Sequence, residues 1–347
     1  MDGFARRLLD WYDRHGRHDL PWQHPRTPYR VWVSEVMLQQ TQVATVIPYF
    51  HRFVDALPDL RALAAADEDK VLAMWSGLGY YRRARHLHSA AQLCKTRHDG
   101  RLPRDFEALA ALPGIGRSTA GAILALAHEQ RHAILDGNVK RVLCRYHGVH
   151  GWPGERSIEN ALWAHAEAHT PSTRIADYAQ AIMDFGATLC TRSRPDCNHC
   201  PQRRTCVAHR GDLTASLPTP QPARVLPQRQ TVFIVLRDRR NRVLLQRRPP
   251  HGVWPGLWSL PEAASESDAK AAAMRWANLE GHAGDVLPAI RHTFTHYKLQ
   301  ASPIAWRDVR IRRAVADAPD VRWCDRAELA KLGIPAPVRK LILCGLQ

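Results

Sequence analysis

The chain has 347 residues, of which 45% are hydrophobic and 24% charged, and its formal net charge is +16. This composition is typical of globular proteins and excludes a wholly disordered chain, and the length suits about two domains. No run reaches about 18 apolar residues, and the first residues lack the apolar stretch and cleavage site of a secretory signal. We therefore expect a cytoplasmic protein with no membrane partner.

The positive charge is spread over the whole chain. Residues 1–211 carry a net charge of +7, and residues 212–347 carry +9. A basic surface indicates a polyanionic partner such as nucleic acid. The alternative is compositional, because only 7 of the 49 cations are Lys in an Ala-rich chain, as a GC-rich genome would encode. Charge alone leaves both interpretations open.

Three segments differ in their residue pattern. Residues 1–211 place apolar residues at spacings of three and four, which predicts helices joined by short turns. Residues 212–228 hold four prolines and predict an extended linker. Residues 229–347 contain two apolar runs, at 231–236 and 243–246, which predict strands around a polar turn. The fold class expected is a helical domain linked to an α+β domain.

Glu35 lies in a segment that begins as a helix should. Thr27 suits the N-cap position, and Pro28 suits the first helical position. Helical spacing places on one face Trp32, Glu35, Val36 and Gln39. A carboxyl group among apolar neighbours resists ionisation and can act as a general acid. A lone Glu is more often a surface or paired residue, and that alternative stays open.

A glycine-rich turn lies between two helical patterns at residues 112–120, which read LPGIGRSTA. Glycines permit a tight turn with little side-chain bulk, and the next helix then begins with exposed N–H groups that suit a phosphate. The segment resembles a helix-hairpin-helix motif, which would position a duplex without reading its bases. A plain connection between helices is the alternative.

Asp136 follows an apolar run and precedes another helical pattern. It is a candidate helix cap, and it is also a candidate for the ionised partner of Glu35. One protonated and one ionised carboxyl group are what cleavage of a glycosidic bond through a cationic sugar requires. The sequence does not show whether the two residues meet.

Four of the eight cysteines form a run with the pattern C-x6-C-x2-C-x5-C, namely Cys190, Cys197, Cys200 and Cys206. Reduced cysteines at this density predict a metal site. One short hook with two longer arms favours a [4Fe–4S] cluster over zinc, whose sites usually pair two short hooks. We expect the cluster to serve mainly in folding.

These motifs, in this order, resemble the MutY-type adenine DNA glycosylases of the helix-hairpin-helix superfamily. The similarity is carried by residues 33–41, 77–81, 112–120 and 135–139 and by the four cysteines. It implies a monomer acting on double-stranded DNA with an adenine opposite 8-oxoguanine or guanine, in a bacterial cytoplasm on the nucleoid. It implies that Glu35 protonates the flipped adenine and that Asp136 stabilises the sugar cation.

The resemblance also implies roles for residues around the lesion. Gln40 and Tyr80 match residues that enter the base stack or hold the opposite base. Trp22, Trp32 and Gln180 are candidates for the adenine pocket, with core packing as the alternative for the tryptophans. Further DNA contacts are implied for Leu112, Gly114, Gly116, Arg117, Ser118 and Asn138.

Ser118 distinguishes this chain from relatives that also cut the strand. Endonuclease III-type enzymes carry a nucleophilic Lys at this position, and Ser cannot form a Schiff base with the sugar. We therefore expect base removal without efficient strand cleavage. An enzyme of that bifunctional type remains an alternative, and so does a non-enzymatic iron–sulfur module that binds DNA.

Residues 244–261 and 291–296, in the last third of the chain, resemble the corresponding segments of a Nudix (MutT-like) domain. Nudix hydrolysis needs a helix with clustered glutamates, and the expected helix at residues 268–279 has none. A Nudix hydrolase with a DNA-binding arm is therefore disfavoured. In the family this domain recognises 8-oxoguanine through a Phe-Ser-His loop, for which this chain has Phe294, Thr295 and His296.

Overall fold

The computed structural model describes residues 1–279, 284–312 and 320–344. The chain divides into two compact units, one formed by residues 1–65 and 86–223 and the other by residues 66–85 and 224–347. No helix in the described residues is long and apolar enough to cross a bilayer.

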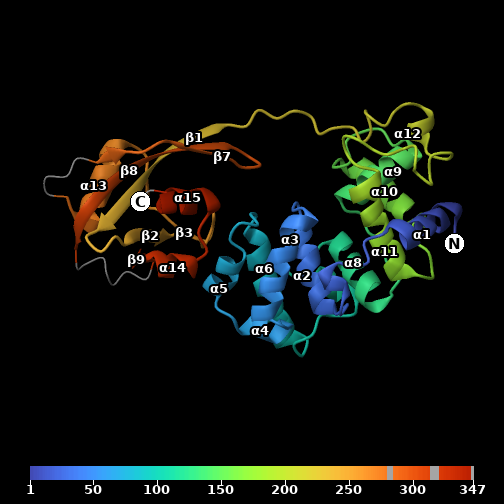
Figure 1. The fold of residues 1–347 in the computed structure, drawn as a ribbon, viewed down its shortest axis with the longest axis horizontal. Coiled ribbons are helices and arrows are strands. Elements are labelled where there is room, and N and C mark those ends of the chain that lie inside the picture. The colour runs from blue at the N-terminus through green and yellow to red at the C-terminus, as the bar shows by residue number, and fades with distance from the viewer. Residues whose placement is uncertain (280–283, 313–319, 345–347) are drawn as a thin grey trace. The chain divides into compact units, whose positions relative to one another are not determined.

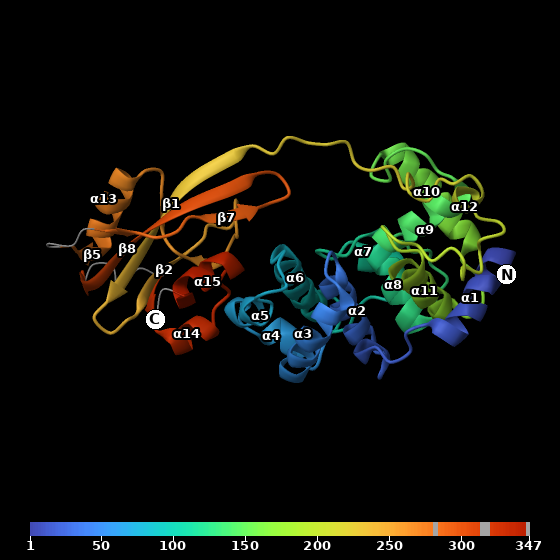
Figure 2. The same ribbon diagram turned by 45° about the horizontal axis from the view of Figure 1, so that its top comes forward.

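The first unit is helical, as expected from its apolar spacing (Figures 1 and 2). Its elements are α1 (Gly3–His15), η1 (Pro21–Gln23), α2 (Pro28–Leu38), α3 (Val43–Ala56), α4 (Leu60–Ala65), most of α6 (Arg82–Arg97), α7 (Phe106–Ala110), α8 (Arg117–His128), α9 (Gly137–His147), α10 (Arg156–His169), α11 (Ile175–Asp184), the π-helical turn η2 (Phe185–Leu189) and α12 (Val207–Arg210). Helix α2 packs against α3 and α8, and α11 packs against α1, α8 and α9.

The beginning of α2 is as predicted. Thr27 is the N-cap, where its side chain accepts a hydrogen bond from the backbone N–H of Arg30 at 3.2 Å, and Pro28 is the first helical residue. Because the cap satisfies an N–H group that has no partner in the helix, it fixes where α2 begins. The rotation of the helix then turns Trp32 into the core.

The second unit contains the sheet. Its strands are β1 (Gln228–Asp238), β2 (Val243–Arg247), β3 (Trp258–Ser259), β4 (Glu262–Ala263), β5 (Ala277–Asn278), β6 (Asp285–Val286), β7 (Ile290–Thr293), β8 (Lys298–Ile311) and β9 (Val321–Cys324). Its helices are α5 (Glu68–Met74), α13 (Glu266–Trp276), α14 (Arg326–Ala330) and α15 (Ala336–Cys344).

The sheet is built around two long strands. Strand β1 runs parallel to β8 and antiparallel to β2, and the main strand order is β3-β2-β1-β8-β5. Helix α13 packs on β1 and β8 through the small side chains of Ala269, Ala272 and Ala273. The two predicted strands are confirmed as parts of β1 and β2. Residues 211–227 form no helix or strand.

One helix boundary was predicted wrongly. Helix α13 begins at Glu266, not at residue 268, and ends at Trp276. Its N-cap is Ser265, whose Oγ accepts from the backbone N–H of Asp268 and donates to the Asp268 carboxylate at 2.7 Å. The capping residue therefore brings Glu266 into the helix, so the expectation that this helix contains no Glu was incorrect.

Residues 66–85 have their partners in the second unit. Asp69 accepts hydrogen bonds from Nη2 of Arg247 at 2.7 Å and from Nε1 of Trp258 at 3.2 Å. The hydroxyl of Tyr81 donates to the carbonyl of Ile334 at 3.0 Å. These contacts join α5 and the turn that follows it to the sheet unit.

Candidate active site and cysteine site

Glu35 lies in the middle of α2, and its side chain is only half-buried by exposed area. Its helix neighbours Trp32 and Val36 are buried, and among the described residues no hydrogen bond partner is found for its carboxyl group. Burial, with the nearby charge of Asp136 as a second cause, raises the pKa of Glu35 to about 8. Glu35 therefore holds its proton at neutral pH.

Asp136 is the N-cap of α9, so the capping role considered from the sequence is present. Its Oδ1 accepts from the backbone N–H of Val139 at 2.8 Å, and its Oδ2 accepts from Nδ2 of Asn138 at 3.2 Å. Burial raises the pKa of Asp136, while these hydrogen bonds and the positive charge of Arg141 act in the opposite direction. The charge of Asp136 contributes to the raised pKa of Glu35, so the two carboxyl groups interact electrostatically.

A half-buried arginine joins the Asp136 loop to the cysteine segment. Arg141 donates from Nη2 to Oδ1 of Asn138 at 2.9 Å and to the carbonyl of Gly186 at 2.7 Å. Its Nε donates to the carbonyl of Cys190 at 2.8 Å. Gly186 has no room for a side chain, because a Cβ there would lie 2.7 Å from that of Asn138.

The glycine-rich turn between α7 and α8 has the geometry that its sequence requires. Gly114 has φ +78°, and a Cβ at this position would lie 2.7 Å from Cβ of His86. Gly116 is the N-cap of α8 without a side-chain cap, and a Cβ there would meet no atom within 4 Å. Leu112 is buried. The turn therefore leaves the first N–H groups of α8 without a side chain in front of them.

Arg117 and Ser118, which follow Gly116, differ in environment. Arg117 pairs with Glu167, and its guanidinium lies 3.9 Å from the ring centroid of Trp163. Ser118 accepts at Oγ a hydrogen bond from the backbone N–H of Leu135 at 2.9 Å. Ser118 thus ties the turn to the residue before Asp136.

The three candidates for the adenine pocket are all buried. Trp22 and Trp32 are core residues, at 3% and 0% exposure, and Nε1 of Trp32 has no partner among the described residues. Gln180 donates from Nε2 to Oδ1 of Asp184 at 2.8 Å. Asp184, which is fully buried, also pairs with Arg17 at 2.6 Å. No local sequence pattern indicates this pair, because its members are far apart in the chain.

Gln40 and Tyr80 both have left-handed backbone conformations, with φ +58° and +49°. Gln40 follows α2 in the first unit and is exposed, whereas Tyr80 belongs to the second unit and is 50% exposed. Residues other than glycine adopt this conformation uncommonly. Both side chains are exposed at the surface.

The four predicted cysteines border one hollow. Arg145 is buried and donates from Nη1 to Sγ of Cys190 at 3.4 Å. Burial, with the other three thiols as further causes, raises the pKa of Cys200 to about 12. Among the described residues no three His, Cys, Asp or Glu side chains are close enough to hold a single metal ion.

In the second unit, Phe294, Thr295 and His296 form the turn between β7 and β8. The turn is closed by a hydrogen bond from the N–H of Phe294 to the carbonyl of Tyr297 at 2.8 Å. Thr295 and His296 are exposed, and the ring of Phe294 lies 5.4 Å from that of Trp254. The loop is a strand connection, and its Thr and His side chains are accessible.

Comparisons with known proteins find a matching family for each unit. Residues 33–168 match the HhH-GPD superfamily of base excision DNA repair proteins, and residues 231–343 match the NUDIX domain. The chain is 35% identical over 342 residues to the adenine DNA glycosylase of Buchnera aphidicola (Acyrthosiphon pisum), covering 98% of this chain and 96% of that protein. It is 33% identical to the Homo sapiens adenine DNA glycosylase over 407 residues, covering 98% and 73%.

Solved structures agree with the fold of the helical unit. A thermostable thymine-DNA glycosylase superposes with a TM-score of 0.54 at 28% identity, over 60% of this chain and 95% of that one. Endonuclease III in a complex with DNA gives 0.52 at 19% identity, with the same coverage, and shows the fold alone. The chain therefore belongs to the adenine DNA glycosylase family, hydrolytic DNA N-glycosylases of base excision repair.

Proposed function

We propose that this protein removes adenine mispaired with 8-oxoguanine or guanine in double-stranded DNA, with Glu35 as general acid and Asp136 as the group that stabilises the sugar cation. The observation that carries the proposal is the pair itself. Glu35 is half-buried and its pKa is raised to about 8, which favours the protonated form at neutral pH, while Asp136, whose pKa burial raises, accepts two hydrogen bonds that favour its ionised form.

The reaction follows from these two states. The target base lies inside a duplex, so it must first be flipped into the protein. Glu35 gives its proton to a ring nitrogen of adenine, and the C1′–N9 bond then breaks with both electrons leaving on the neutral base. Asp136 stabilises the cationic sugar, by its charge or by a transient bond, until water adds its oxygen to C1′ and gives a proton to the Glu35 carboxylate, which restores the acid. The products are free adenine and an abasic site.

The DNA contacts proposed are those of the turn and the exposed surface residues. The N–H groups at the start of α8 would bind a backbone phosphate beside Gly114 and Gly116, with Leu112, Arg117, Ser118 and Asn138 near the same strand. Gln40 and Tyr80 would enter the stack or hold the opposite base, and Trp22, Trp32 and Gln180 would border the adenine pocket. A monomer suffices for this arrangement.

The four cysteines would hold a [4Fe–4S] cluster. They border one hollow, and Arg145 donates to a cysteine sulfur as expected beside a thiolate. The cluster would stabilise the segment that Arg141 joins to the Asp136 loop. Visible absorption of the purified protein tests this proposal, since a colourless protein would contradict it.

Recognition of 8-oxoguanine is assigned to Phe294, Thr295 and His296. The loop exposes a hydroxyl group and an imidazole. Thr295 keeps the hydroxyl of the serine found in the family's loop and adds a methyl group. Thr295 can therefore form the hydrogen bond that the serine forms in the family's loop.

The decisive test uses an end-labelled duplex with adenine opposite 8-oxoguanine, under single-turnover conditions, half of it treated with hot alkali. We expect cleavage at the adenine only after alkali, because Ser118 offers no amine to form a Schiff base with the sugar. Cleavage without alkali, or an adduct trapped efficiently by borohydride, would contradict this and favour a bifunctional enzyme. Tight binding without cleavage, with the cluster intact, would favour a binding module.

A further inference from the structure

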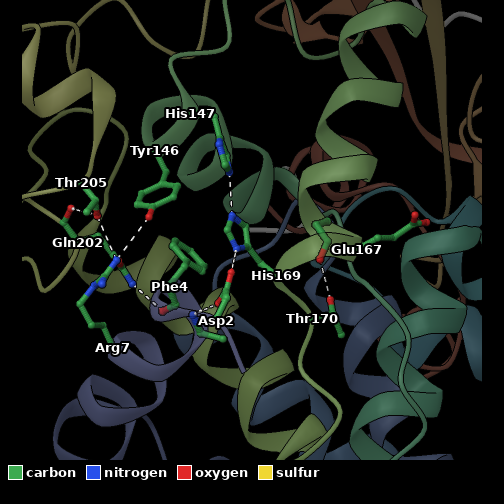
Figure 3. Close-up of polar contacts among 12 residues, drawn as sticks. Asp2, Phe4, Arg7, Tyr146, His147, Glu167, His169, Thr170, Gln202 and Thr205 are labelled. Carbon is green, nitrogen blue, oxygen red and sulfur yellow. Dashed lines mark hydrogen bonds and ion pairs between the residues drawn. The ribbon is translucent and has the colours of Figure 1, made fainter.

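Three histidines and an aspartate link the beginning of α1 to α9 and α10, and we call them the histidine chain: Asp2, His147, His165 and His169. Figure 3 shows Asp2, His147 and His169 of this chain. Asp2 pairs with Nδ1 of His169, and Nε2 of His169 lies 2.8 Å from Nε2 of His147. The ring of His165 stacks on His147 at a centroid distance of 3.6 Å and an angle of 11°.

The same turn of α1 forms part of the wall of the cysteine hollow. Phe4, Tyr146 and Gln202 border the hollow, and the Phe4 and Tyr146 ring centroids lie 4.6 Å apart. Arg7 donates to Oε1 of Gln202 at 2.9 Å, and Nε2 of Gln202 donates to the carbonyl of Phe4 at 2.9 Å. Phe4 also packs on His169, at 4.4 Å between centroids. The histidine chain therefore supports the residues that close the hollow.

Only one proton can lie between the facing Nε2 atoms of His147 and His169, because these atoms are 2.8 Å apart. His169 is a donor to Asp2 through Nδ1, and it can also donate through Nε2 if the facing nitrogen of His147 carries no proton. Protonation of His147 while both nitrogens of His169 carry protons would place two N–H donors against each other at 2.8 Å. It would also put charge beside the stacked ring of His165.

We propose that acid releases the first turn of α1 from the cysteine hollow by protonating His147. The titratable groups that face His147 come from three elements: His165 and His169 from α10, Asp2 from the residue before α1, and Tyr146 from its own helix. Arg7 of α1 donates a hydrogen bond to the hydroxyl of Tyr146. None of the four members of the chain belongs to the proposed catalytic site or to the cysteine ligands.

The direction of the pH effect follows from linkage. Burial, and the neighbouring imidazoles after it, lower the pKa of His147 to about 4 from an ordinary value of 6.5. The released state then binds more protons than the docked state between these two values. Docking is therefore complete above pH 6.5 and weakens as the pH falls toward 4, by about tenfold for each pH unit.

The inference about the hollow rests on the proposed cluster, so two measurements are combined. The first follows loss of the cluster's visible absorption to a ferrous-iron chelator between pH 7.5 and 5.0. The second follows hydrogen exchange of the α1 amides, expressed as protection relative to the intrinsic rate at each pH, and needs no metal. The variant is His147→Gln, whose carbonyl can still accept from His169 but cannot titrate. The control is His150→Gln, an exposed histidine in the same segment.

We expect α1 protection to fall, and cluster loss to accelerate, by about 10–30-fold from pH 6.5 to 5.0 in the natural protein and in His150→Gln. In His147→Gln both should change less than threefold. Equal pH dependence in His147→Gln, or none in the natural protein, would overturn the proposal. A protein without cluster absorption would refute the cofactor, while the exchange measurement would still decide on the histidine chain.

Discussion

The pKa of Glu35, raised to about 8, sets the pH range in which this residue can serve as an acid. The protonated form is the active one, so the excision rate should be flat at neutral pH and fall about tenfold per pH unit well above pH 8. Glu35→Gln should lower the single-turnover rate by about 10²–10⁴ and leave DNA binding intact. Glu107→Gln, at an exposed position on α7, is the control.

Glu35→Gln should also stabilise the fold, which separates a catalytic role from a structural one. A Glu whose pKa is raised on folding destabilises the native state as the pH rises from 4.5 to about 8, because the unfolded chain loses its proton first. We therefore expect a higher Tm for the variant at pH 8 and no gain at pH 4. A lower Tm at pH 8 would mean that Glu35 serves packing.

Asp136 can be tested with a substitution that preserves its cap. Asn is as good an N-cap as Asp, so Asp136→Asn should change the free energy of unfolding by less than about 1 kcal/mol. Excision should nevertheless fall by about 10² or more, because the negative charge beside the sugar is lost. The matched control is Asp105→Asn, which alters the N-cap of α7, where Asp105 accepts from Ala108 at 2.9 Å. If Asp136→Asn and Asp105→Asn lost equal stability and Asp136→Asn kept its excision rate, Asp136 would serve only as a helix cap.

The turn between α7 and α8 is the element whose shape depends most on glycine. Gly114→Ala places a Cβ at φ +78° and 2.7 Å from His86, so it should destabilise the protein by about 1–2 kcal/mol and weaken DNA binding. Gly116→Ala meets no atom, so stability should be retained while the added methyl group obstructs a phosphate. Calorimetry and DNA-binding titrations distinguish the two effects, and normal binding by Gly116→Ala would contradict the phosphate site.

The elements that could be predicted are those whose boundaries have local causes. Thr27 and Pro28 determine where α2 begins, and alternating apolar residues determine β1 and β2. The beginning of α13 was missed by two residues because the cap is Ser265, which the apolar pattern does not reveal.

The Asp184–Arg17 pair and the histidine chain depend on residues more than 100 positions apart, so no local pattern indicates them. The two histidines four residues apart on α10, His165 and His169, were the only available hint.

The two units hold different parts of the proposed machinery. The helical unit holds the two carboxyl groups, and the sheet unit holds the loop assigned to the opposite base. The net charge of +16 attracts any DNA without regard to sequence, so it can supply affinity but no choice between 8-oxoguanine and guanine. Discrimination must then come from side chains that contact the opposite base.

This division predicts a variant that loses discrimination while keeping its chemistry. Thr295→Ala removes the exposed hydroxyl group of the loop, so the preference for adenine opposite 8-oxoguanine over adenine opposite guanine should fall by about 3–10-fold, the worth of one hydrogen bond of 0.5–1.5 kcal/mol. The single-turnover rate at saturating enzyme should stay unchanged for the guanine mispair, because Glu35 and Asp136 are untouched. Thr293→Ala, an exposed threonine at the end of β7, is the control and should alter neither quantity. If Thr295→Ala instead slowed both mispairs equally, the loop would support the fold or general DNA binding, and recognition of 8-oxoguanine would have to be sought elsewhere in the chain.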